Sequence, residues 1–330
     1  MDRKNGFFNG GDRQGVIPGL LKGGGIVDYA EQQRIMDFGC IPNEKTPEAL
    51  AEIAIKEVPW DATDKPPVCT WSSFEKFLID QPDQRINWFE AVDPYKYFTP
   101  SQSYRPNCAG FAMANAATCA LISQITNRFS EQTQVKFNPF VTWLRSKNGS
   151  VSGGQSIAAI ALAGNEYGNF LAEDVGPYDP GKIIRTTQPE EDQHALEHQI
   201  GYCLYDGNEP WEAILLALQK GFACFVGNSR AVSGSSRDSN GVPVANLSGS
   251  WSHATAFAGF QVVNGVRYAF WINSHGDIYE SDGKTPKFGC WMSESILKTF
   301  MNSTFNDLCI LTYTEAPYDP SVAETLNPTV

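Results

Sequence analysis

The chain has 330 residues, of which 42% are hydrophobic and 19% are charged, a composition typical of one large or two modest globular domains. Its 37 acidic residues outnumber the 25 basic ones, and the net charge of −12 argues against the basic face that nucleic-acid binding needs. No uninterrupted apolar run approaches the roughly 18–20 residues of a membrane helix, and the N-terminus lacks the apolar stretch of a signal peptide. We therefore expect a soluble protein without a nucleic-acid or membrane partner.

The eight cysteines are interpreted as thiols. The chain is long enough to build an apolar core without cross-links, and nothing in the sequence directs it to an oxidising compartment. No Cys-x-x-Cys pair occurs, which argues against zinc ribbons and redox-active dithiols. We expect the cytoplasm or another reducing compartment, and neither a cofactor nor a metal.

Residues 1–84 are expected to form an N-terminal arm with short helices and a role that the sequence does not reveal. The first 25 residues contain eight glycines and show little periodicity. Thr46 and Pro47 are typical of a helix start, and a second short helix is predicted from Ser72 to Leu78. Such an arm is a candidate for docking to another protein.

Residues 85–318 are expected to form the main domain, followed by a tail over 319–330. Small and apolar residues at helical spacing predict a central helix over residues 108–125 and further helices over 157–163 and 210–218. The period then changes, and strands are predicted over 222–226, 255–263, 266–272 and 309–313. Asn264-Gly265 is a hairpin turn signal between two of them. Helices followed by antiparallel strands predict an α+β domain with a cleft between its two halves.

Four residues in this domain have the chemistry of a cysteine-dependent hydrolase. Cys108 begins the central helix, where unpaired N–H groups and the helix dipole favour a thiolate. His253 would exchange the proton of the thiol, and Asn273 would orient the imidazole. Gln102 precedes Cys108 by six residues, and its side-chain amide, with the Cys108 N–H, could stabilise an oxyanion.

These residues and their flanks resemble the papain-like cysteine peptidases. In that family His and Asn follow the nucleophile by about 130–150 residues; His253 falls within that range and Asn273 somewhat beyond it. Gln102 matches the family's oxyanion glutamine, and Asn273-Ser274-His275-Gly276 is similar to its Asn-Ser-Trp-Gly. The resemblance covers roughly residues 85–315. It implies a two-subdomain fold and hydrolysis of peptide or isopeptide bonds in a peptide or protein substrate through a thioester.

The resemblance also implies residues that line the substrate site. Gly153 and Gly154 correspond to a Gly-Gly pair beside the family's cleft, and Ser252 directly precedes the histidine. The chain departs from the family in two places. Arg105-Pro106-Asn107 replaces the Cys-Gly-Ser before the nucleophile and Ala109 replaces the Trp after it, while His275 stands where a Trp shields the His–Asn pair.

Two alternatives remain from the sequence. The first is a papain-like module of weak or no activity that serves a structural or binding role in a larger assembly, such as a viral particle. The second is a zinc peptidase, because His194, Glu197 and His198 have the His-x-x-Glu-His spacing that places two histidines and a glutamate on one helix face.

Overall fold

The structure, a computed structural model, describes residue 40 and residues 68–71, 86–88, 92–126, 133–149, 153–182 and 186–313. The helix predicted from Thr46, the helix predicted from Ser72 and the C-terminal tail lie outside these described residues. The division of the chain into arm, main domain and tail therefore stays a prediction. Residues 68–70, which belong to the predicted arm, form an edge strand of the main sheet.

The described strands form one mixed sheet. They are β1 (Val68–Thr70), β2 (Ile86–Asn87), β3 (Gly201–Leu204), β4 (Cys224–Arg237), β5 (Pro243–Val263), β6 (Val266–Ile272), β7 (Gly289–Ser293) and β8 (Asn306–Tyr313). The order is β1-β3-β8-β4-β5-β6-β7, with β2 added to β5. The pairings are antiparallel, except that β1 runs parallel to β3 and β7 parallel to part of β5.

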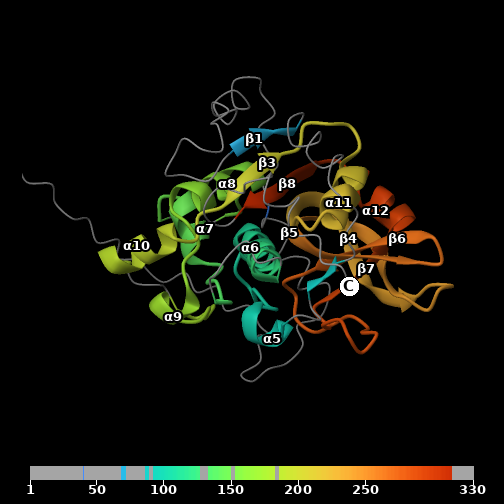
Figure 1. Ribbon diagram of the computed structural model, residues 1–330, viewed down its shortest axis with the longest axis horizontal. Coiled ribbons are helices and arrows are strands. Elements are labelled where there is room, and N and C mark those ends of the chain that lie inside the picture. The colour runs from blue at the N-terminus through green and yellow to red at the C-terminus, as the bar shows by residue number, and fades with distance from the viewer. Residues whose placement is uncertain are drawn as a thin grey trace, which may run out of the picture.

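The described helices are α5 (Pro94–Tyr97), α6 (Cys108–Thr126), α7 (Val141–Ser146), α8 (Ile157–Glu166), α9 (Ala172–Val175), α10 (Pro189–Leu196), α11 (Pro210–Gln219) and α12 (Glu294–Met301). Figure 1 shows α6 at the centre, with α7 to α10 on one side and β4 to β7, α11 and α12 on the other. We call these two sides the helical half and the sheet half.

The sheet buries both of its faces, and the alternation of side chains along each strand assigns them. Phe225, Phe270 and Leu311 pack in the cluster that contains α6, whereas their chain neighbours Val226 and Trp271 belong to the cluster that contains α11 and α12. Successive residues of a strand point to opposite faces, so these runs have to be apolar at nearly every position.

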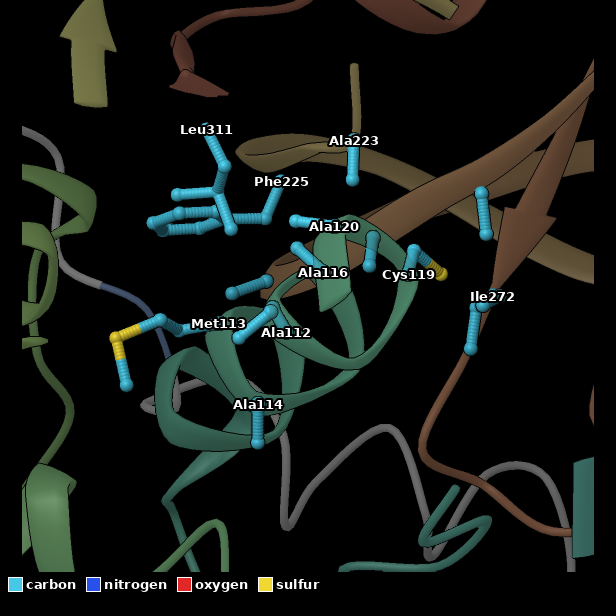
Figure 2. Packing of buried hydrophobic residues seen from close by; sticks show 14 of the residues in the cluster. Ala112, Met113, Ala114, Ala116, Cys119, Ala120, Ala223, Phe225, Ile272 and Leu311 are labelled. Atoms are coloured by element: carbon cyan, nitrogen blue, oxygen red, sulfur yellow. The ribbon is translucent and has the colours of Figure 1, made fainter. Parts of the chain in front are cut away.

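Helix α6 packs closely against the sheet because its buried residues are small. Ala112, Ala116 and Ala120 lie near Phe225 and Leu311 (Figure 2). On the helical half, a Cβ at Gly110 would lie 2.2 Å from the Pro139 carbonyl oxygen, so only glycine permits this approach of the segment before α7. The N-terminal end of α6, with Cys108, is thereby fixed between the two halves.

Among the described residues, α6 alone is long and apolar enough to cross a membrane, with a mean hydropathy of 1.4 over Cys108–Ile125. This corrects the expectation that no segment qualifies, which considered only uninterrupted apolar runs. Because 94% of that window is buried inside the fold, α6 has the surroundings of a core helix.

The predicted α+β class is confirmed, and the helices and strands predicted from residue 108 onward are present with shifted ends. The largest difference is at β4 and β5, which continue well beyond 222–226 and 255–263 to form a long hairpin. Its polar, glycine-containing end has no apolar alternation, so periodicity could not detect it. The turn at Asn264-Gly265 is confirmed, with positive φ at both residues (50° and 79°).

Candidate active site

Cys108 is the first residue of α6. The Asn107 carbonyl accepts a hydrogen bond from the Phe111 N–H at 3.2 Å, which makes Asn107 the capping residue. The Cys108 Sγ accepts a hydrogen bond from the Ala254 N–H at 3.4 Å. The sulfur therefore lies at the N-terminal end of a helix and beside the residue that follows His253 on β5.

His253 is held by Asn273, which follows the end of β6. Its Nε2 lies 2.8 Å from Asn273 Oδ1, and this contact fixes the tautomer with the proton on Nε2 because the amide oxygen can only accept. The Asn273 Nδ2 donates to the Tyr279 hydroxyl at 2.7 Å, and the Asn273 Oδ1 also accepts from the Ser274 N–H at 2.8 Å. Two contacts, with Tyr279 and with the Ser274 N–H, thus orient the amide that orients the imidazole.

Gln102 reaches the same region through strand-like pairing with the loop after β6. Its N–H donates to the Ser274 carbonyl at 2.8 Å, and its Oε1 accepts from the Ser274 hydroxyl. The Nε2 donates one proton to the Arg105 carbonyl at 2.8 Å. An amide nitrogen carries two protons, so this bond leaves a second one for a ligand.

The site is buried, and burial decides its charge state. Cys108 and His253 are both 0% exposed. Burial raises the pKa of the Cys108 thiol to about 12, although the N–H groups of Ala254, Ala109 and Cys108 itself lower it. Burial lowers the pKa of His253 to about 4, against the opposing effect of its bond to Asn273. Both groups are therefore neutral at pH 7.

This arrangement differs from the expected thiolate–imidazolium pair. Within the described residues, His253 Nδ1 has no hydrogen-bond partner, so no bond joins it to the Cys108 sulfur. The helix N-terminus does favour the thiolate, as expected, but the loss of hydration outweighs it. The structure brings Cys108, His253, Asn273 and Gln102 into one region without engaging the thiol with the imidazole.

Residue 40 contributes to this burial, because Cys40 lies between the two halves. Its N–H donates to the Ser252 carbonyl at 3.3 Å, and its own carbonyl accepts from the Ser252 hydroxyl. On the helical half, Cys40 forms a parallel β-bridge with Gln155. Cys40 is only 3% exposed and belongs to the same buried cluster as Cys108.

The residues expected to bind substrate are thus next to residue 40. Ser252 bonds to Cys40 directly, and Gly154 is the chain neighbour of Gln155. Gly153 is exposed with φ of 70°, which favours glycine, and the Gly154 carbonyl accepts from Lys147 Nζ at 2.7 Å. Gln155 and Ser252 thus contact residue 40 from the two halves of the molecule.

His275 is the main departure from the family pattern at the site. Its ring lies 4.6 Å from that of His253 with an interplanar angle of 30°, and Trp251 meets His275 edge-on at 5.7 Å. Both ring nitrogens of His275 are without a hydrogen-bond partner among the described residues. Burial, and then repulsion from His253, hold the pKa of His275 well below its ordinary value. A neutral His275 ring thus covers the His253 ring.

His194, Glu197 and His198 do not lie together on one helix face, contrary to the prediction for a zinc peptidase. Helix α10 ends at Leu196, so Glu197 caps it and His198 lies beyond it. His194 Nδ1 is paired with Asp174 at 2.8 Å, and the rings of His194 and His198 are 5.8 Å apart. In the described part of the chain, no group of three or more His, Cys, Asp or Glu residues could hold a metal ion.

Sequence reasoning missed two residues of this site. Tyr279 supports Asn273 from a loop without regular structure, and no local pattern marks it. Cys40 lies far from the other site residues in the sequence, inside a stretch interpreted only as an arm. That stretch contains two cysteines, Cys40 and Cys69, and nothing in their flanks singles out Cys40.

No family model and no curated protein matches the sequence. Solved structures do match. Xylellain, a cysteine protease from Xylella fastidiosa, is 13% identical with a TM-score of 0.53, covering 85% of this chain and 97% of its own. The proform of the ragweed pollen allergen Amb a 11, also a cysteine protease, is 16% identical with a TM-score of 0.50, covering 70% of this chain and 65% of its own. At this identity the likeness concerns the fold, and the chain is a divergent example of the papain-like cysteine protease fold.

Proposed function

We propose that the protein hydrolyses peptide or isopeptide bonds in a peptide or protein substrate through a thioester on Cys108. The observation that carries the proposal is the joint placement of two groups. The Cys108 sulfur contacts the N–H of the residue after His253, and the His253 ring is fixed at 2.8 Å by Asn273 with its Nδ1 unprotonated. The cysteine protease fold of the structural neighbours supports the same reaction class.

In the proposed reaction His253 Nδ1 takes the proton of the Cys108 thiol, and the sulfur attacks the carbonyl carbon of the substrate. The negative charge that develops on the carbonyl oxygen is stabilised by the Cys108 N–H and the second Nε2 proton of Gln102. When the tetrahedral intermediate collapses, the carbon–nitrogen bond breaks and protonated His253 gives its proton to the leaving amine. Water activated by His253 then hydrolyses the thioester, and the thiol is restored.

Burial has to be relieved before this chemistry can begin. Proton transfer from Cys108 to His253 is strongly unfavourable while one pKa is about 12 and the other about 4. Hydration of the site moves both values toward their ordinary range and so favours the ion pair. We therefore propose that the active form is one in which residue 40 has left its place between Gln155 and Ser252.

The test is cleavage of a defined peptide mixture, read by mass spectrometry, with wild type, Cys108→Ala and Cys119→Ala. Loss of the nucleophile should reduce cleavage by about 10⁴-fold or more. Cys119→Ala, a change of the same size on the same helix, should leave cleavage unchanged. Equal cleavage by wild type and Cys108→Ala would contradict the proposal.

A non-catalytic module is the second candidate, and one observation favours it: the Cys108 sulfur is fully buried and neutral. Such a module would use the same fold to bind within a larger assembly. The same experiment separates the two candidates. Absence of cleavage by wild type, even in a variant with residue 40 displaced, would favour the module.

A further inference from the structure

Cys40 places a second thiol at the candidate active site. Its backbone is bonded in both directions to Ser252 and bridged to Gln155, so residue 40 is attached to both halves. These contacts on both halves fix the backbone of residue 40 and therefore the position of its side chain.

That side chain lies against the strand pair that contacts the candidate nucleophile. A Cβ at Gly227 would lie 2.5 Å from Cys40 Sγ and 3.0 Å from Ile157 Cγ1, so glycine makes room for the thiol. Gly227 on β4 is the register partner of Ala254 on β5. The Ala254 N–H in turn contacts Cys108 Sγ at 3.4 Å. Both sulfurs therefore lie against the same cross-strand pair, in the buried cluster that contains α6.

The electrostatics agree with this proximity. Burial raises the pKa of the Cys40 thiol well above its ordinary value, and the neighbouring Cys108 thiol and Asp307 carboxyl raise it further. Asp307 on β8 is the other register partner of Gly227. Cys40 therefore stays a neutral thiol while it is seated beside Cys108.

We propose that Cys40 is a thiol latch: a peroxide converts Cys40 and Cys108 to a disulfide that locks residue 40 over the site, and a thiol reductant releases it. The inference rests on the proposed function in that Cys108 is taken to be the reactive thiol. It goes beyond that function because it assigns Cys40 as the disulfide partner of Cys108 and peroxide as the oxidant that stops catalysis.

The reaction is balanced with hydrogen peroxide as the oxidant. In the opened site His253 takes the Cys108 proton, the thiolate attacks one peroxide oxygen and the O–O bond breaks, so that Cys108 sulfenic acid forms and the leaving hydroxide takes the proton from His253 as water. When residue 40 returns, its sulfur attacks the Cys108 sulfur, the S–O bond breaks, and the leaving hydroxide takes the Cys40 thiol proton and departs as a second water. Two thiols are oxidised by two electrons in total, and the peroxide is reduced to two waters. A dithiol reductant reverses the change.

The chain offers a matched control pair. Cys119 on α6 and Cys224 on β4 are also buried neighbours, since the Cys224 thiol raises the pKa of Cys119. Sulfenic acid formation follows thiolate character and exposure, and in that pair burial raises both pKa values with no backbone N–H group opposing it among the described residues. We expect peroxide to join Cys40 to Cys108 and to leave Cys119 and Cys224 as thiols.

The experiment is a non-reducing tryptic map of the 330-residue protein after treatment with hydrogen peroxide. Cys40 lies in the tryptic peptide 35–45 as its only cysteine, and Cys108 lies in 97–128 together with Cys119. A Cys119→Ala background therefore assigns the cross-link to Cys108. The peptide pair 35–45/97–128 should exceed any other linked pair at least about tenfold and should disappear after reduction or in Cys40→Ser.

Recovery of function gives a second measurement. Wild type inactivated by peroxide should regain most of its activity with dithiothreitol, whereas Cys40→Ser should not, because its sulfenic acid proceeds to the irreversible sulfinic acid. The map needs no activity, so a Cys40–Cys108 cross-link in a protein that cleaves nothing would support the latch and contradict the proposed function. Peptide cleavage without a Cys40–Cys108 cross-link would support the proposed function and contradict the latch. Random disulfide pairing of Cys40 with the other cysteines would also overturn the latch.

A third variant tests the position of the residue 40 side chain. Cys40→Asp places a carboxylate between Gly227 and Ile157 beside Asp307, a position in which a charge is strongly disfavoured. Iodoacetamide should then label Cys108 at least about tenfold faster than in Cys40→Ser, which retains the shape of the side chain. Equal labelling in the two variants would overturn the position assigned to residue 40, and circular dichroism of both checks that they are folded.

Discussion

Cys108 and Cys119 lie on the same helix, and both are completely buried thiols with raised pKa values. Their surroundings differ in kind. Around Cys119 only burial and a second thiol act, and both disfavour the thiolate. Around Cys108 three backbone N–H groups oppose burial, and His253 and Asn273 are ordered nearby.

Burial by itself therefore does not distinguish a structural thiol from a reactive one. Removing the apolar cover from Cys119 would mean unfolding the helix from the sheet, since Ala116, Ala120 and Phe225 belong to the same cluster. The cover of Cys108 includes residue 40, which comes from a distant part of the chain and is held by a few backbone bonds. Both sulfurs lie in the same buried cluster, and they differ in that the polar groups of His253 and Asn273 are placed near Cys108.

Gln102→Ala is expected to give the largest loss of activity among the variants that leave both sulfurs in place, and it acts only at the end of α6 near Cys108. Loss of one oxyanion donor should lower kcat by about 10²–10³-fold, while KM changes little, because the bond strengthens only as charge develops. Steady-state kinetics of peptide cleavage measure this.

The matched control is Gln124→Ala, a buried glutamine at the other end of α6. It should lower stability without lowering kcat. Equal losses of kcat in the two variants would mean that Gln102 acts through the fold and that the end of α6 near Cys108 is not special.

The difference also explains how much could be predicted from the sequence. Helix α6 and strand β6 follow from helical and alternating periodicity, and the order of Gln102, Cys108, His253 and Asn273 from their flanks. Closure of the site could not be predicted, because it depends on a contact between Cys40 and Ser252 that no local pattern encodes. The hydrogen bond between Asn273 and Tyr279 and the contact between the His275 and His253 rings are likewise products of tertiary packing.

The pH dependence of stability tests the polar surroundings of Cys108. His253 is neutral in the folded state with a pKa of about 4, against an ordinary value of 6.5, so the unfolded chain binds more protons between these pH values. This contribution to stability is fully present above about pH 6.5 and is lost as the pH falls toward 4, by about 3 kcal/mol at most.

Urea denaturation between pH 7 and pH 4.5 measures this loss. His275 contributes in the same direction, because its pKa is lowered by burial and by His253. The variant His275→Phe keeps an aromatic ring in the shielding place and removes one of the two groups that titrate. Its stability should therefore fall less steeply with acid than that of wild type. An identical slope would mean that His275 is protonated or exposed in the folded protein.

Cys119→Ala is expected to give the smallest effect, and it tests whether the surroundings of Cys119 have a structural role only. Removal of a buried sulfur from a close-packed cluster should lower the free energy of unfolding by about 1 kcal/mol, measured by urea denaturation. Activity, Cys108 labelling and the acid dependence should stay unchanged, since no contact of Cys119 reaches His253 within the described packing. A change in Cys108 labelling would show instead that the two ends of α6 are coupled, and that closure of the site depends on the core of the helix as well as on residue 40.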